Sequence, residues 1–407
     1  MARRGVYDAG TFQMSDARLQ IIADIRRDLC ADENGEIGRR TNGLKSQLSS
    51  AAQRLAEDLY ATSTHFIMEL VQNADDNAYG ADVTPFIQFV LQPDYLLVSN
   101  NELGFEEENV RALCSLGKST KTKKHGYIGE KGIGFKSVFV WTDEPHVLSN
   151  GFDFKFKHGN VTPPGELGFL VPYALCRGQW PADESIVDEN TTFYLPFRER
   201  GEHSRANAAS ELAKQFRNDM QPETVLFLRK LNTIKLWYPD GPDGYTLVSY
   251  SRSLHPNQID VEVEKDTTVY RRMSDAYGRG AFLPSQPVRV SNLYKRGEHE
   301  YLVPEKSREP RRNYERTTIM IAFPTNQDGQ PNVARTNAVF AFLPIRSFGF
   351  RFVIQADFLL VANREDIIKD NVWNEFLRDK LPDTFLHLFP SLFKNDPNHR
   401  LQYSWFR

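Results

Sequence analysis

Cysteine is scarce in this sequence, with three residues among 407, at Cys30, Cys114 and Cys176. So few cysteines, so widely separated, cannot build a disulfide framework or a four-cysteine zinc site. Long apolar runs are also lacking, because no stretch approaches the roughly 18 consecutive apolar residues of a membrane-spanning helix. No apolar segment follows Arg3 and Arg4, which argues against a secretory signal. We therefore expect a soluble intracellular protein, cytoplasmic or nuclear, with no membrane partner.

An excess of either charge is lacking too, since 50 Lys and Arg residues face 53 Asp and Glu residues. This near balance excludes a protein that holds nucleic acid mainly by bulk positive charge, although a local basic groove, and hence a nucleic-acid partner, stays open. Apolar residues (40%) and aromatic residues (12%) are plentiful, which excludes a disordered chain, a collagen and a coiled-coil rod. At about 150 residues per domain, the length predicts two or three domains.

Helices and short strands alternate in the first half of the chain. Apolar residues at helical spacing predict helices over 17–30, 43–60, 64–80, 105–117 and 206–220. Apolar runs next to turn residues predict strands over 86–91, 95–100, 152–156 and 191–197. A segment rich in glycine and lysine, residues 119–137, interrupts this order.

Short strands dominate the second half. They are predicted over 231–238, 245–251, 317–324, 339–344 and 350–361, and a terminal helix over 371–389 is expected to break at Pro382. The basic segment 307–316 is predicted to be an exposed loop. The change of pattern predicts a helical extension over 1–45, a glycine-rich domain over 46–202 and a strand-rich α+β domain over 203–407.

Glu69 and Asn73 are the first candidate site residues. They lie four residues apart in a predicted helix, so both side chains lie on one face, one turn apart. A carboxylate beside a carboxamide can orient a water molecule and hold a phosphate-bound magnesium ion, which prefers oxygen ligands. The alternative is an ordinary polar helix face in contact with solvent.

Three closely spaced glycines, Gly129, Gly132 and Gly134, form the second candidate element. Without a Cβ atom, glycine lets backbone N–H groups approach a phosphate, and the residues from Phe135 onward could open a helix whose N-terminus favours anions. The segment 117–120, GKST, resembles the end of a P-loop but lacks the first glycine of that motif. The dinucleotide fingerprint is excluded because Ser137 occupies its third glycine position.

Taken together, these motifs resemble those of the GHKL ATPase superfamily, which includes gyrase, the ninety-kilodalton heat-shock chaperones, histidine kinases and MutL. The matching elements are E-x-x-x-N-A-x-D from Glu69, N-N-E-L-G-F from Asn100 and G-x-x-G-x-G-F-K-S from Gly129, in that order. The longer segments HFIMELVQNADDN, ALCSLGKSTK, GYIGEKGIGFKSVF, ADFLLVANRED and VWNEFL look like the sacsin and NO VEIN branch of that superfamily.

The resemblance implies a fold of the α+β class. It implies a Bergerat-type α/β sandwich over 46–202, with a mixed, mostly antiparallel sheet covered by helices, and then a transducer-like α+β domain. The implied activity is magnesium-dependent ATP binding with slow hydrolysis, which drives lid closure and domain rearrangement in a chaperone-like or regulatory clamp. The partners implied are ATP, Mg²⁺ and an unidentified protein client, and a nucleotide-dependent homodimer is among the allowed assemblies.

Roles follow by position from the same resemblance. Glu69 matches the general base that polarises the attacking water, Asn73 the magnesium ligand and Asp76 a supporting acidic residue. The phosphate cradle and the opening of its helix correspond to Gly129, Gly132, Gly134, Phe135, Lys136 and Ser137. The mobile lid beside the triphosphate corresponds to Lys118, Ser119 and Thr120, and the last strand of the nucleotide site to Thr192.

One position departs from the family pattern. Asn100, four residues before Gly104, stands where the family has an aspartate that accepts a hydrogen bond from the adenine amino group, and Glu102 replaces a usual glycine. Asparagine offers a carbonyl oxygen to that amino group but also an NH₂ donor, so rejection of guanine should be weaker. The choice between ATP and GTP therefore stays open, and so does a second function, a nucleotide-gated scaffold with negligible turnover.

Overall fold

The structure is a computed structural model, and two compact units are distinguished in it. It describes residues 14–29, 43, 47, 65–115, 134–162, 167–175, 180–181, 186, 190–199, 204–239, 244–271, 281–282, 287–308, 311, 314–361 and 366–393. Unit 1 comprises Met1–Asp219, Ile234–Leu247 and Asp266–Gln286, and unit 2 comprises Met220–Thr233, Val248–Lys265 and Pro287–Arg407. The sequence-based division at 45 and 202 is linear, whereas these units are made of interleaved segments.

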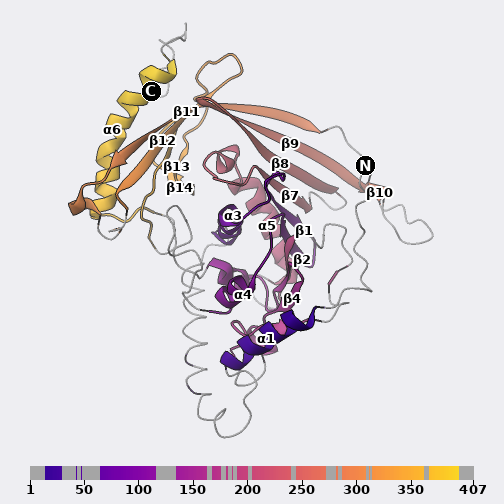
Figure 1. The fold of residues 1–407 in the computed structure, drawn as a ribbon. Coiled ribbons are helices and arrows are strands. Elements are labelled where there is room, and N and C mark those ends of the chain that lie inside the picture. Colours follow the sequence, from indigo (N-terminus) through magenta and orange to yellow (C-terminus); the bar gives the residue numbers. More distant parts are fainter. Residues whose placement is uncertain are drawn as a thin grey trace. The chain divides into compact units, whose positions relative to one another are not determined.

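The predicted α+β class is confirmed. The described residues contain few helices and many strands, and the strands form a large mixed sheet (Figure 1). The described pairings are antiparallel, apart from β13 (Ala338–Ala341) with β15 (Val353–Gln355). The sheet is thus rich in strands, and the prediction of a sheet covered by helices is not confirmed for the part of the chain that the structure describes.

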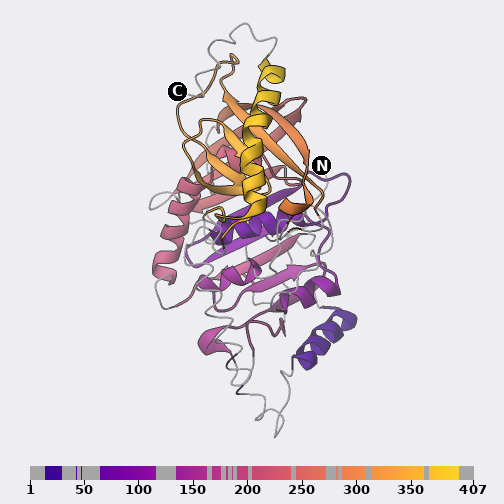
Figure 2. The same cartoon turned by 90° about the vertical axis from the view of Figure 1, so that its left-hand side faces the viewer.

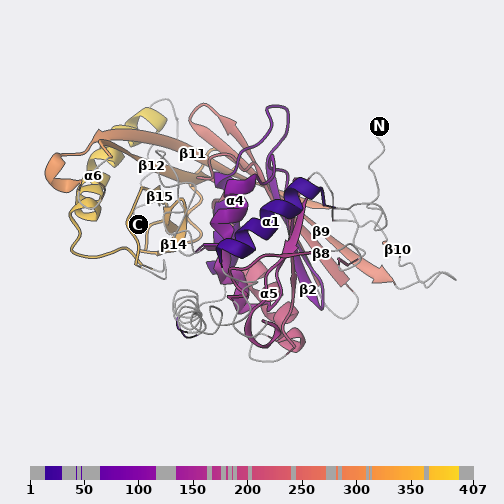
Figure 3. The ribbon, with the colours of Figure 1, turned by 60° about the horizontal axis from the view of Figure 1, so that its bottom comes forward.

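Unit 1 holds the segments that carry the predicted motifs. Its strand order is β7-β1-β2-β6-β3-β4-β5. Its elements are α1 (Asp16–Asp28), α3 (His65–Asp76), β1 (Phe86–Leu91), β2 (Tyr95–Asn100), α4 (Glu107–Leu113), the 3-10 helix η1 (Gly134–Val140), β3 (His146–Ser149), β4 (Phe152–Lys155), η2 (Gly159–Val161), β5 (Tyr173–Ala174), β6 (Thr191–Pro196), α5 (Arg205–Asp219), β7 (Thr233–Pro239) and β10 (Ala281–Phe282). Helices α1 and α4 lie side by side (Figure 3), joined by an ion pair of 2.8 Å between Asp28 and Arg111.

The register of β1, β2 and β6 separates two faces of the sheet in unit 1. Phe89 and Phe193 point to one face, because Phe89 contacts Phe216 of α5 and Phe193 contacts Phe135 of η1. We name this the α5 face. Leu97 and Leu148 point to the other face, where they pack in a cluster with Trp180, and we name it the Trp180 face.

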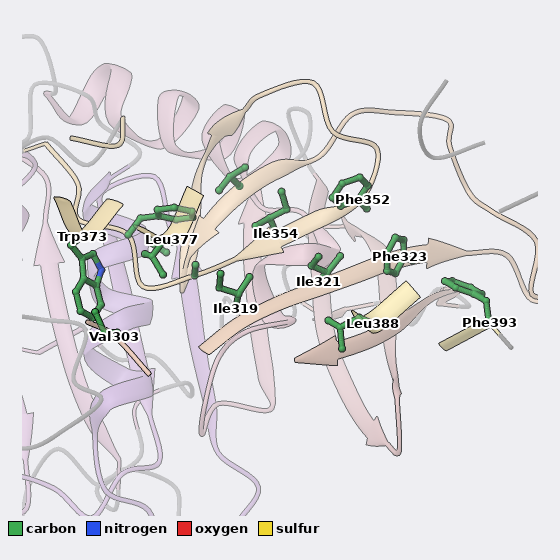
Figure 4. Close-up of a cluster of buried hydrophobic side chains, with 14 residues drawn as sticks. Val303, Ile319, Ile321, Phe323, Phe352, Ile354, Trp373, Leu377, Leu388 and Phe393 are labelled. Atoms are coloured by element: carbon green, nitrogen blue, oxygen red, sulfur yellow. The ribbon is translucent and has the colours of Figure 1, made fainter. Parts of the chain in front are cut away.

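Unit 2 contains a second buried core (Figure 4). Its described elements are η3 (Pro222–Val225), β11 (Val288–Leu302), η4 (Glu305–Ser307), β12 (Arg316–Thr325), β13, β14 (Leu343–Ser347), β15 and α6 (Val372–Phe393), in the strand order β14-β13-β15-β12-β11. Strands β8 (Gly244–His255) and β9 (Gln258–Arg271) contribute residues to both units. Helix α6 lies across β11 and β12 (Figure 2) and buries Trp373, Leu377 and Leu388 in this core.

Helix α6 runs through Pro382 without interruption, so the predicted break is wrong. Proline removes one N–H group from the helix ladder, which usually ends or kinks a helix. Here the buried Leu377 and Leu388, on either side of the proline, anchor both halves of the helix in the same hydrophobic core. Thr384 also donates its hydroxyl to the Lys380 carbonyl at 2.8 Å, one turn back. Tertiary packing therefore overrides the local signal.

Five strands were not predicted from the sequence: β3, β5, β9, β10 and β11. In β9, Ile259 and Val261 are buried while the intervening Asp260 is partly exposed, a period-two pattern that could have indicated the strand. In β11, polar residues occupy most positions because much of the strand is exposed. Its antiparallel pairing with β12 joins two separate segments of the chain, and no local sequence pattern predicts it.

The basic segment 307–316 is not simply an exposed loop in its described residues. Ser307 is buried, and the Arg308 side chain donates to the Val303 carbonyl at 3.0 Å. Arg311 pairs with Asp357 and lies over the Trp373 ring at 5.3 Å. These arginines support the fold of unit 2, which weakens the sequence argument for nucleic-acid contact here. The predicted helix over 43–60 lies outside the described residues, apart from positions 43 and 47.

Several other predicted boundaries are confirmed. Strands β1 and β2 occupy the predicted ranges 86–91 and 95–100, and α5 begins and ends within one residue of its predicted range. Within the residues that the structure describes, no helix is both long enough and apolar enough to cross a membrane.

Gly297, in the middle of β11, provides a test of the packing in unit 2. A Cβ atom there would lie 2.8 Å from Leu388 Cδ2 of α6. We expect Gly297→Ala to lower the free energy of unfolding by about 1 kcal/mol, because the added methyl group forces the buried Leu388 side chain to shift from its position. In a Leu388→Ala background the same change should be neutral or stabilising. Urea unfolding of the four variants measures this coupling, and equal effects in both backgrounds would contradict it.

Candidate functional site

Helix α3 is buried on nearly all sides, including its polar residues. Phe66, Leu70 and Val71 supply the apolar contacts expected of a core helix. Glu69 and Asp76, however, are only 4% and 3% exposed. The alternative of a polar helix face in solvent is therefore contradicted.

Burying carboxylates is unfavourable unless they are paired or hydrogen-bonded. Each of the polar residues Glu69, Gln72, Asn73, Asp75 and Asp76 of α3 makes an interaction within the protein. Asn73, between Glu69 and Asp76, is partly exposed, so its carboxamide stays within reach of a ligand. The helix thus presents one accessible amide flanked by buried carboxylates. An arrangement of this kind makes α3 a candidate for a functional site.

The loop after β2 is held against the C-terminal end of α3. The Leu103 N–H group donates to the Ala78 carbonyl at 2.9 Å, and the Tyr79 hydroxyl donates to the Ala74 carbonyl at 2.7 Å. Burial raises the pKa of Tyr79, and the nearby negative charges of Glu102 and Asp75 raise it further. The helix motif and the Asn100–Gly104 motif therefore lie together, as the sequence predicts.

Gly104 has a structural reason to be glycine. Its φ angle is +90°, a conformation that L side chains rarely adopt, and an added Cβ would lie 2.6 Å from the Asn150 Cβ. Asn150 also donates from Nδ2 to the Phe105 carbonyl at 3.0 Å. The tight turn after β2 accounts for this glycine whether or not a nucleotide binds nearby.

Asn100 ends β2 beside two hydroxyl groups on the α5 face. It pairs in register with Thr191 of β6, and the Thr191 and Ser149 hydroxyls lie 2.6 Å apart. The Asn100 Oδ1 atom accepts a hydrogen bond from the Glu102 N–H group at 3.2 Å. One lone pair of this oxygen is therefore already used within the turn.

Thr192 points away from this cluster. Neighbouring residues of a strand point to opposite faces, and the Thr192 hydroxyl lies 3.0 Å from the Ser99 hydroxyl on the Trp180 face. Thr191 is thus the threonine that shares the α5 face with Asn100, and the sequence analysis did not identify it. The signal was available, because Asn100 and Thr191 become partners once the two strands are paired.

The residues after the glycine motif form the 3-10 helix η1, which packs against α3. Gly134 is its first residue. Phe135 is buried against Phe193 with ring centroids 5.4 Å apart, and Ser137 is buried too. A helix does begin where the sequence analysis expected one, and it is the short 3-10 helix η1.

Lys136 does not present its charge to solvent. Its Nζ atom donates to the carbonyls of Leu113 at 2.5 Å and Phe169 at 2.7 Å, and it lies 4.5 Å from the Phe156 ring centroid. Burial lowers the pKa of this ammonium group to about 7, and Cys114 opposes that shift slightly. Its hydrogen bonds are therefore made inside the protein, and its predicted place beside the phosphate cradle stays a prediction.

The remaining predicted residues lie outside the described part of the chain: Lys118, Ser119, Thr120, Gly129 and Gly132. Within the described residues, no group of three or more His, Cys, Asp or Glu side chains could hold a metal ion. A single protein ligand such as Asn73 is still compatible with Mg²⁺, because this ion keeps several waters and often takes only one or two protein ligands beside phosphate oxygens.

The fold and site define an α+β protein whose buried acidic helix lies beside a polar strand end. The model of the Sacsin domain matches residues 50–156. Protein NO VEIN of Arabidopsis thaliana is 34% identical over 387 residues, which cover 91% of this chain and 13% of that protein. Human sacsin (Homo sapiens) is 36% identical over 221 residues, which cover 48% of this chain and 5% of that protein.

These matches support the resemblance to the sacsin and NO VEIN branch. The chain spans only a small part of the length of either relative, so their activities as whole proteins do not transfer to it directly. The wider placement in the GHKL superfamily stays a prediction from the motifs.

The turn at Gly104 provides a test of the site's framework. We expect Gly104→Ala to lower the free energy of unfolding by about 2–4 kcal/mol, because it combines a disfavoured φ angle with a close contact. Gly80→Ala is the matched control, since the nearest atom to its Cβ would be 3.9 Å away. Thermal or urea unfolding measures both, and a Gly104→Ala variant as stable as the control would refute this reading of the turn.

Proposed function

We propose that unit 1 binds ATP with Mg²⁺ and hydrolyses it slowly, in a GHKL-type site built on α3, the β2 end and η1. The observation that supports this most strongly is the burial of Glu69 and Asp76 on a helix that keeps Asn73 accessible. Apolar residues at buried positions of this kind are often neutral or stabilising, so stability alone does not explain the two carboxylates.

Each residue has a proposed role. Glu69 polarises the attacking water, Asn73 helps to hold the Mg²⁺ ion on the phosphates, and Asp76 supports them. Asn100 and Thr191 contact the base, with Gly104 shaping the turn beside it. The residues outside the described ranges, Lys118, Ser119, Thr120, Gly129 and Gly132, surround the phosphates. In this proposal ATP supplies the phosphate oxygens that complete the magnesium coordination.

The consequence of binding would be closure of a lid and rearrangement of the transducer-like segment, for a protein client of unknown identity. The family resemblance and the extended β-rich unit 2 motivate this proposal. A nucleotide-dependent homodimer is compatible with it.

A second candidate function is a scaffold that binds nucleotide but turns it over negligibly. The geometry of Asn100 favours this candidate, since its Oδ1 atom already accepts the Glu102 N–H group. The oxygen is then a weaker acceptor for an adenine amino group than an unengaged aspartate. Weak binding with weak discrimination against GTP would follow.

Nucleotide binding is tested by calorimetry with Mg-ATP and Mg-GTP. We expect the wild type to bind ATP, and Asn73→Ala to weaken binding at least tenfold, because the magnesium–phosphate complex loses a ligand. Gln20→Ala, which changes an exposed amide on α1, should leave the affinity unchanged. Binding of neither nucleotide by the wild type would overturn the site assignment.

Hydrolysis separates the two candidate functions. For the ATPase we expect Glu69→Gln to keep ATP affinity within about threefold and to lower steady-state turnover at least a hundredfold, the usual range for loss of a general base. Glu108→Gln, an exposed glutamate of α4, is the matched control. Wild-type turnover no faster than that of Glu69→Gln would exclude the ATPase and leave the scaffold.

A further inference from the structure

The packing of α6 on β11 in unit 2 brings two histidines together. His299 of β11 and His387 of α6 lie with their ring centroids 4.5 Å apart and their ring planes inclined at 56°. The strand and the helix are in direct contact (Figure 2). Because the two residues are distant in the sequence, only the folding of unit 2 makes them neighbours.

Close contacts on both sides hold this histidine pair in place. Gly297, His299 and Tyr301 alternate along β11, so all three face the helix. On one side of the pair, the Tyr301 hydroxyl lies 2.8 Å from the Thr384 hydroxyl of α6. On the other side, Gly297 lies so near α6 that an added Cβ would be 2.8 Å from Leu388 Cδ2. The two rings are thus positioned before any ligand binds, which lowers the entropy cost of binding.

The ring nitrogens of the pair are not engaged elsewhere in the part of the chain that the structure describes. There, the contacts of the two side chains are ring contacts, His299 with His387 and with Tyr301 at 4.6 Å, and neither ring makes a hydrogen bond or an ion pair. His387 is exposed and His299 partly buried, so a dissolved ion can reach the pair. A neutral imidazole has one nitrogen with a lone pair, and the pair therefore offers two donor atoms.

The carboxylates nearest in sequence, Glu298 and Glu300, have other partners. They alternate with His299, so they point to the opposite face of β11, where they pair with Arg296 and Arg316. Among the described residues, no third histidine, cysteine or carboxylate joins the pair to form a larger metal-binding group. A metal ion at this position would have two protein ligands, and water would fill the other coordination positions.

Two imidazole ligands select a particular class of metal ion. Imidazole suits Zn²⁺, Ni²⁺ and Cu²⁺, whereas Mg²⁺ prefers oxygen ligands. Two ligands held close together bind one ion more tightly than either alone, because the second ligand is already present at a high effective concentration. An ion held by both rings also stabilises the folded state, since the unfolded chain lacks the preformed pair.

We propose that His299 and His387 form a bidentate site for a divalent transition-metal ion such as Zn²⁺. The ion binds one nitrogen of each ring and joins α6 to β11, and water molecules complete its coordination. The inference goes beyond the proposed function, because the site belongs to unit 2, uses nitrogen rather than oxygen ligands and takes no part in binding Mg-ATP.

Calorimetry with ZnCl₂, in the absence of nucleotide, tests the site. We expect His299→Gln and His387→Gln each to weaken Zn²⁺ binding by about tenfold or more, because the remaining ring loses its partner ligand. His255→Gln is the matched control, since His255 is exposed and lies 3.3 Å from a single carboxylate, that of Asp260. Its Zn²⁺ affinity should equal that of the wild type. With MgCl₂ in place of ZnCl₂, all three variants should behave as the wild type.

Two further measurements distinguish a chelate from a single ligand. Electron paramagnetic resonance with one equivalent of Cu²⁺ counts the coordinated nitrogens, and we expect two in the wild type and one in His387→Gln. In urea unfolding, a tenfold rise in Zn²⁺ above its dissociation constant should raise the wild-type folding equilibrium by up to about tenfold. Both histidine variants should lack this gain at the same Zn²⁺ concentrations, whereas His255→Gln should keep it.

Each outcome decides the inference. Equal Zn²⁺ affinities in the wild type and in both histidine variants would overturn the site, and so would weakening by His387→Gln alone, which indicates one exposed ligand. Should His299→Gln fail to fold, the nitrogen count decides: two in the wild type and one in His387→Gln support the site, and any other result refutes it. A wild type that binds Mg-ATP but no Zn²⁺ overturns this inference alone, and one that binds Zn²⁺ but no nucleotide overturns the proposed function alone.

Discussion

The burial of helix α3 is the constraint on which the organisation of unit 1 depends. Its apolar residues, such as Leu70 and Val71, make it a core element, yet it carries Glu69 and Asp76 into the same interior. Carboxylates in such surroundings require partners, so the neighbouring segments must supply them. The 3-10 helix η1 packs against α3, and the loop after β2 is hydrogen-bonded to the residues that follow α3.

The sequence motifs of this site contain residues that support the framework and a residue that we propose contacts a ligand. Gly104 is explained by a positive φ angle and by its contact with Asn150, and Lys136 by hydrogen bonds to two carbonyls. Both belong to motifs that suggest ligand contact, yet both support the framework. Asn73, partly exposed between buried acids, is by contrast the residue that we propose contacts a ligand. A motif therefore mixes residues that bind with residues that hold the binding residues in position.

Much of the local structure could be predicted from the sequence. Strands β1 and β2 and helix α5 were located to within a residue, because their apolar periodicity depends only on close neighbours. The continuity of α6 through Pro382 could not be predicted, since it depends on the packing of Leu377 and Leu388 against residues outside the helix. The choice between Thr191 and Thr192 required the pairing of β6 with β2, because a shift of one residue reverses the face.

The sequence by itself determined the order of the motifs, the α+β class and the residue types available for chemistry. Only the tertiary structure decided that the polar side of α3 is buried, that Thr191 accompanies Asn100, and that Lys136 is occupied within the protein. The physical reason is the separation along the sequence over which each effect acts. Periodicity and turn preferences act over a few residues, whereas burial and hydrogen-bond partners join positions far apart, such as Lys136 and the Phe169 carbonyl 33 residues away. Those partners exist only once the chain has folded.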